Sequence, residues 1–93
     1  MTTAGILRDA KALIDTPAKW TKGVYTDDKG RRCALGALQS VTASEAGRRR
    51  AGRELERALP AWGSVTHYND HHSHADVMAL FDRAIEATER AIA

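Results

Sequence analysis

The strongest constraint on the fold is the apolar pattern of the last twenty residues. Apolar side chains recur there every three or four positions, at Val77, Leu80, Phe81, Ala84, Ile85 and Ile92. This spacing places them on one side of an α-helix. Ser73 and Asp76 form a capping box at its start. The pattern predicts a long amphipathic helix over residues 74–91 that buries one face.

Three further helices are predicted, near residues 3–16, 32–42 and 45–59. Pro17 ends the first and Pro60 the third, because proline disfavours helical geometry in the residue before it. The second contains Gly36, which costs about 1 kcal/mol relative to alanine inside a helix. We therefore expect another backbone, or an aromatic ring such as Trp20 or Trp62, to approach this helix closely.

Between the first two helices, the residues favour a short β-hairpin. Val24, Tyr25 and Thr26 favour extended structure, and residues 27–30 (DDKG) have turn chemistry. We predict strands at 23–26 and 31–33, with an irregular loop around the same turn as the alternative. The fold class is thus mainly α, a small four-helix domain with a short β-hairpin between helices 1 and 2. Its predicted core is Ile6, Leu7, Ala10, Leu13, Ile14, Leu35, Leu38, Val41, Leu55, Leu59, Val77, Leu80, Phe81 and Ile85.

The chain length and the cysteine count limit how the fold is stabilised. Its 93 residues suggest a single domain over 1–93, with a thin core that association into homo-oligomers would reinforce. The single cysteine, Cys33, permits no internal disulfide and fits a reducing compartment. No stretch has the roughly 20 apolar residues of a membrane helix, and the N-terminus has no signal-peptide pattern. We expect a cytoplasmic protein with no membrane partner.

Arginines dominate the predicted third helix, at positions 48, 49, 50, 53 and 57. Arg49, Arg53 and Arg57 form one stripe, which could follow a phosphate backbone. Residues 44–60 carry five arginines and three glutamates, whereas residues 61–93 have a net charge of −3. The alternative to nucleic-acid binding is therefore a solvated face that pairs with the last helix, through Asp82, Glu86 or Glu89. We favour this pairing and keep nucleic acid as the second hypothesis.

Four histidines, His67, His71, His72 and His74, lie within eight residues. The first three are in a segment (60–73) predicted to be a loop, and His74 begins the predicted last helix. His67 and His71 have the i, i+4 spacing of zinc ligands, but this spacing needs a helix. A polar loop that caps the following helix is the favoured interpretation, and we predict no metal site.

Cys33 is a candidate nucleophile if it begins the second helix, because a helix N-terminus favours the thiolate. His67 with Asn69 or Asp70 would complete a hydrolase set. No oxyanion loop is recognisable, and a buried structural cysteine is the favoured alternative. We predict no catalytic residue and no cofactor.

Asn69 and Asp70 are expected to hold their own loop through hydrogen bonds to its backbone. The alternative is a ligand or partner contact flanked by Trp62 and Tyr68.

Several of these residues together resemble a known family. The segment Cys33-Ala34-Leu35-Gly36-Ala37-Leu38 and the later Tyr68-Asn69-Asp70 are similar to the C-x-x-G-A-L helix start and W-N-D motif of small uncharacterised domains from actinobacteria and their phages. The resemblance covers about residues 5–88, and Tyr68 stands where that family usually has tryptophan. It implies a small α-helical accessory protein of a phage or an actinobacterium.

The function predicted from these features is that of a non-enzymatic protein-binding module whose partner is a host or phage protein. Nucleic-acid binding through residues 48–57 is the alternative, and a Cys33-dependent hydrolase comes third. The predicted partner-binding surface joins the arginine helix to the segment after it, through Arg48, Arg49, Arg53, Arg57, His67, Tyr68, Asn69 and Asp70.

Overall fold

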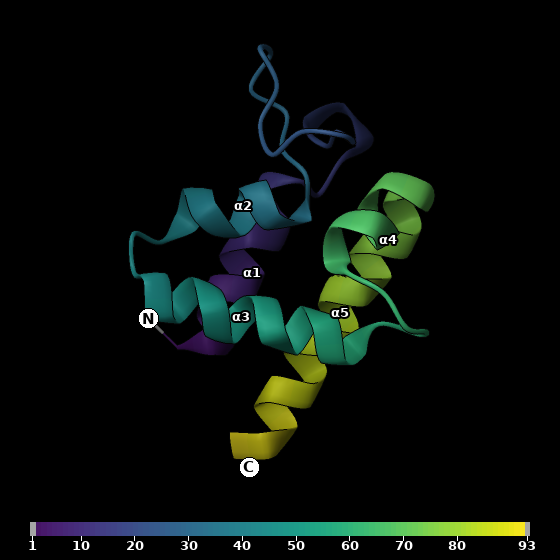
Figure 1. Cartoon of the computed structure of the whole chain (residues 1–93). Helices are drawn as coiled ribbons and strands as arrows, with labels where there is room; N and C mark the ends of the chain where they lie inside the picture. The colour runs from purple at the N-terminus through teal and green to yellow at the C-terminus, as the bar shows by residue number, and fades with distance from the viewer. Residues whose placement is uncertain (1, 93) are drawn as a thin grey trace.

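A computed structural model describes residues 2–92, and it contains five α-helices in that range (Figure 1). The helices are α1 (Thr3–Leu13), α2 (Ala34–Val41), α3 (Glu45–Ala58), α4 (Val65–His71) and α5 (His74–Ile92), with a short 3-10 turn at Pro17–Lys19. The four helices predicted from the sequence correspond to α1, α2, α3 and α5. None of the helices in the described residues is both long and apolar enough to cross a bilayer.

The predicted β-hairpin is wrong, since residues 2–92 contain no β-strand. Only isolated bridges form, from Arg32 to Trp20 and to Thr26. The turn itself is present, but the carboxylate of Asp27 accepts from the amides of Lys29 and Arg31 at 3.0 and 2.8 Å. Two bonds of hairpin type form, from the Asp27 amide to Arg31 and from the Cys33 amide to Tyr25. The pairing stops at the single bridge between Thr26 and Arg32, because the amide and carbonyl of Arg32 bond Lys19 and Thr21 and Cys33 already caps α2. Residues 20–33 form an irregular loop at one end of the molecule, beyond the start of α2 (Figure 1).

The count of four helices is also wrong, because α4 forms within the segment predicted to be a loop. Ser64 caps this helix by accepting from the amide of His67 at 3.0 Å. Val65, at 5% exposure, anchors it in the core. A seven-residue helix with polar residues at most positions is not stable alone, so packing stabilises what intrinsic propensity does not.

The core lies where α1 packs against α2, α3 and α5. Nine of the predicted core residues are buried: Ile6, Leu7, Ala10, Ile14, Leu38, Leu55, Val77, Leu80 and Phe81. Five others are only partly buried at its edge: Leu13, Leu35, Val41, Leu59 and Ile85. The side chain of Ile92 lies outside the described part of the structure. Small residues such as Ala34, Ala37, Ala51 and Ala84 fill the contacts between the helices.

Side-chain caps fix three helix starts, and the one at Ser73 was predicted from the sequence. Thr2 accepts from the amide of Gly5 at the start of α1, and Ser44 accepts from Gly47 at the start of α3. At the start of α5, the Ser73 hydroxyl accepts from the amide of Asp76 at 3.1 Å, and the Asp76 carboxylate faces the Ser73 amide. These bonds fix where the helices begin and hence where the loops between them lie.

Candidate functional site

Asn69 joins three segments that are far apart in the sequence. Its side chain is 1% exposed. Oδ1 accepts from the indole N–H of Trp20 at 2.7 Å and from the amide of Ala34 at 3.1 Å. Nδ2 donates to the carbonyl of Thr21 at 3.1 Å and to the carboxylate of Asp70 at 3.2 Å. Asn69 therefore fastens α4 to both ends of the 20–33 loop, and it is not accessible to a partner.

Asp70 holds the next part of the same loop. Its Oδ1 accepts from the amide of Gly23 at 3.0 Å. That bond, together with a smaller effect from Asn69, lowers the pKa of the Asp70 carboxyl despite some desolvation. Asx residues at this position were expected to bond their own loop, whereas here both bond a distant one. Both residues therefore have a structural role, in which they connect α4 to a segment distant in the sequence.

Cys33 caps α2 and so lies just before the helix, not within it as the predicted range 32–42 had it. Its Sγ accepts from the amide of Gly36 at 3.4 Å, and the residue is 3% exposed. The buried thiol therefore serves as the N-terminal cap of α2. This geometry matches the favoured interpretation of Cys33 as a buried cysteine.

Gly36 is required because the Tyr25 carbonyl lies directly against it. A Cβ atom at position 36 would lie 1.9 Å from that oxygen. The same oxygen accepts from the amide of Cys33 at 3.1 Å. The predicted close approach to this helix thus exists, and it is made by backbone rather than by Trp20 or Trp62. The main chain of Tyr25 is consequently fixed at the start of α2.

The side chains next to this anchor border a hollow, which we call the Tyr25 groove. This Tyr25 groove has a volume of about 430 Å³ and is lined by Gly23, Val24, Tyr25, Cys33, Thr66 and Asp70. Val24 and Tyr25 are half exposed although both are large apolar residues. Asp70 is the charged residue of its lining, and no histidine lines it. His67, the proposed partner of Cys33 in a hydrolase set, is exposed elsewhere on α4.

The histidines of α4 pair with aromatic neighbours along the helix. The rings of His67 and His71 stack at 4.1 Å, and those of Tyr68 and His72 stack at 3.8 Å. The helix that the i, i+4 spacing needs does form, contrary to the loop prediction. Within the described residues, no group of three or more potential ligands is placed to hold a metal ion. His74 instead bonds the carbonyl of Ile14 at 2.7 Å.

The arginines of α3 do not pair with α5, so the pairing predicted between these helices is wrong. Arg49 pairs with Glu45, and Arg57 pairs with Glu54, both at 2.9 Å and both within α3. Arg48 donates to a backbone carbonyl in the preceding turn. The acidic residues of α5 have other partners: Asp82 with Lys11, Glu86 with Arg90, and Glu89 with Arg8.

The predicted partner-binding surface is therefore split between different environments. Asp70 lines the Tyr25 groove. Arg49 and Arg53 line a second hollow of about 400 Å³ between α3 and the start of α4. Thr66 lies on both hollows and separates them. The sequence did not single out Val24 or Thr66 as site residues, because neither carries a distinctive chemical group.

Trp62 forms a separate exposed feature. It is fully exposed at the loop between α3 and α4. A shallow hollow of about 180 Å³ beside it is lined in part by Leu59, Tyr68 and His72. Trp62, expected to flank Asn69 and Asp70, thus lies apart from the Tyr25 groove, whose lining does not include it.

Comparison with known proteins gives a family without a function. A family model described as "Family of unknown function (DUF6197)" matches residues 1–87. The chain belongs to this family. No curated protein and no solved structure matches the chain. Membership of DUF6197 agrees with the expectation of a small uncharacterised domain family, and it assigns no activity to the groove.

Proposed function

We propose that this DUF6197 member is a protein-binding module and that the Tyr25 groove is its binding site. The observation that carries the proposal is that Val24 and Tyr25 are half exposed on a loop whose backbone is hydrogen-bonded to the start of α2. Buried polar bonds and a glycine contact hold that loop, while its apolar side chains face solvent. Loops positioned by a rigid scaffold are where binding residues concentrate.

The anchoring of Tyr25 favours binding for an energetic reason. A tyrosine side chain contributes a large contact area and has few rotatable bonds to immobilise. Its main chain is already held by Cys33 and packed against Gly36. Little ordering free energy then remains to oppose association, so an apolar contact here contributes efficiently to affinity.

The lining specifies the chemistry of the occupant. Apolar surface from Val24 and Tyr25 suits an aliphatic or aromatic side chain. Asp70 is ionised at neutral pH, because its pKa is lowered, and it uses one oxygen to hold Gly23. The other oxygen suits a cationic neighbour in the ligand. The expected occupant is a segment of a partner protein that carries an apolar residue beside a lysine or arginine.

A binding role fits the chemistry of the groove better than catalysis does. The thiol of Cys33 accepts a helix-capping bond, and the groove lining supplies no histidine to act as its base. The resemblance to actinobacterial and phage domains makes a host or phage protein in the cytoplasm the expected partner.

Selection from a random peptide library, followed by affinity measurement, tests this proposal. We expect the selected peptides to carry an apolar residue next to a basic one. Tyr25→Ala removes the anchor, and Thr66→Arg fills the groove from an exposed position of α4. Each is expected to weaken binding about tenfold or more, as hot-spot truncations do.

Trp62→Ala is the matched control, because it removes an exposed aromatic ring outside the groove. It should leave the peptide affinity unchanged. Peptides whose binding depends on Trp62 and ignores Tyr25 and Thr66 would move the site to the α3–α4 loop. Failure to select any peptide would count against the module itself.

A further inference from the structure

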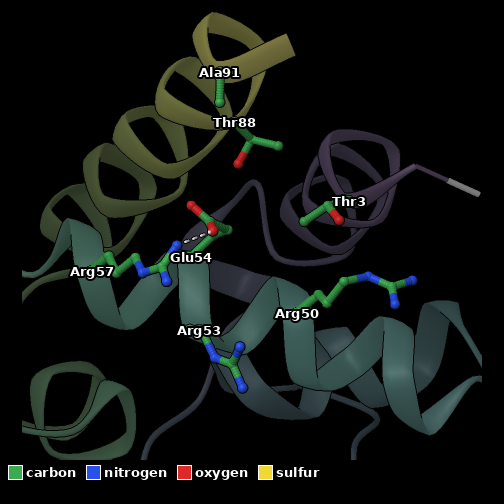
Figure 2. Close-up of a pocket in the computed structure, with 7 residues that line it drawn as sticks. All are labelled: Thr3, Arg50, Arg53, Glu54, Arg57, Thr88 and Ala91. Atoms are coloured by element: carbon green, nitrogen blue, oxygen red, sulfur yellow. Dashed lines mark hydrogen bonds and ion pairs between the residues drawn. The ribbon is translucent and has the colours of Figure 1, made fainter.

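A further hollow lies between α3 and the helices α1 and α5, and Arg53 lines both this hollow and the one between α3 and α4. The former hollow is open, has a volume of about 310 Å³, and is lined by Thr3, Arg50, Arg53, Glu54, Arg57, Thr88 and Ala91. The residues come from α1, α3 and α5 (Figure 2). We call it the Arg50 groove.

Positive charge in the Arg50 groove is not balanced by the surrounding protein. Its one acidic lining residue, Glu54, pairs with Arg57 at 2.9 Å (Figure 2). The ion pairs of residues 2–92 include neither Arg50 nor Arg53. The acidic side chains of α5 that could have neutralised them are engaged by cations outside this groove. The guanidinium groups of Arg50 and Arg53 are therefore without an acidic partner among the described residues.

Arg50 and Arg53 extend from neighbouring positions of α3 in different directions, so a shared ligand requires Arg53 to turn toward Arg50 (Figure 2). Arg50 and Arg53 are three residues apart on α3, so they are neighbours on one helix surface. In Figure 2, Arg50 extends from α3 on the side of Thr3, the first residue of α1. The first turn of α1 contains no acidic residue, so the positive end of its dipole adds to the same field.

We propose that the Arg50 groove binds a small-molecule oxyanion, a phosphate or carboxylate group, through Arg50 and Arg53. The guanidinium fork matches both groups by paired hydrogen bonds, which a point charge such as lysine does not do. Arg53 is exposed, so its guanidinium can rotate about its long side chain to meet an anion held by Arg50. A hollow of this volume is at the lower end of small-molecule sites, so it suits a small ligand.

Isothermal titration with two probes, inorganic pyrophosphate and citrate, tests the site at constant ionic strength. We expect saturable binding with one site per chain. The double variant Arg50→Gln, Arg53→Gln is expected to weaken binding about tenfold or more, since it removes both charged groups that would bond the anion. Both side chains are exposed, so the variant should retain the fold. A preference for pyrophosphate over citrate would identify a phosphate ligand, and the reverse a carboxylate.

Arg49→Gln is the matched control, because it removes the same charge from the same helix outside this groove. It should leave the affinity for both probes unchanged. Equal weakening by Arg49→Gln, or no saturable binding, would overturn the site. Binding of duplex DNA that weakens in all three arginine substitutions would replace it with nucleic-acid binding along α3. Tyr25→Ala, which removes the anchor of the Tyr25 groove, should not change the titration, so this site and the peptide site are tested separately.

Discussion

The indole N–H of Trp20 donates to Oδ1 of Asn69 at 2.7 Å, and this bond joins residues 49 positions apart in the sequence. The same oxygen accepts from the amide of Ala34. Asn69→Ala would leave both donors without this partner. Because each unsatisfied donor costs about 1–3 kcal/mol, we expect a loss of about 2–4 kcal/mol in the free energy of unfolding, measured by urea denaturation.

His71→Ala is the control for this substitution, because His71 is exposed on the same helix. It should change stability by no more than about 0.5 kcal/mol, as surface substitutions usually do. Equal effects of the two substitutions would mean that Asn69 is not the fastening point of the loop.

Two of the helical glycines, Gly36 and Gly52, should respond in opposite directions to alanine. Gly36→Ala places a Cβ atom 1.9 Å from the Tyr25 carbonyl oxygen, and neither backbone can yield cheaply. We expect a loss of about 1–3 kcal/mol, the usual cost of overpacking, although alanine favours the helix. At Gly52 the nearest atom is Leu38 Cδ1 at 4.0 Å, so Gly52→Ala should raise stability by up to about 1 kcal/mol. A stabilising Gly36→Ala would contradict the close contact.

Leu80 is fully buried in the core formed with α1 and α3. Leu80→Ala is expected to cost about 2–5 kcal/mol, the range for core truncations. A thermal melt provides the measurement. An unchanged melting temperature would show that α5 does not bury this face.

Acid should weaken the attachment of the loop through Asp70. Its pKa is lowered in the folded protein, chiefly by the amide of Gly23. The unfolded chain therefore binds the proton more readily, so the stabilisation is complete above the ordinary carboxyl value of 3.8 and is lost as pH falls through the lower folded value. Urea midpoints below pH 5 should fall less steeply in Asp70→Asn than in the parent. Identical slopes would contradict the assignment.

The sequence predicted the helices that carry a regular apolar stripe and a capping side chain. Periodicity located α5, and the capping box of Ser73 and Asp76 located its start. Two features depend on contacts between distant residues and left no local pattern. The helix α4 is mostly polar and is held by Val65 and Asn69 in the interior. The loop before α2 has strand-forming residues, but its pairing stops at the bridge between Thr26 and Arg32, because Arg32 also bonds residues 19 and 21.

The candidate site was predictable only in part. Cys33 and Gly36 were noticed, and the cost of a glycine in a helix indicated a close backbone approach. That the approaching backbone is Tyr25, and that its side chain borders a groove with Thr66, follows from the tertiary structure. The pairing of α5 with α1 instead of α3 likewise depends on how the helices face one another.

An NMR titration of the ¹⁵N-labelled protein with a library-selected peptide tests the central claim most directly, since it maps the binding site on the folded chain. The Tyr25 groove predicts the largest amide shift changes at Gly23, Val24, Tyr25, Thr66 and Asp70, with small changes around Trp62 and along the arginine face of α3. Changes centred on Trp62 and His72, with the groove residues unaffected, would contradict it.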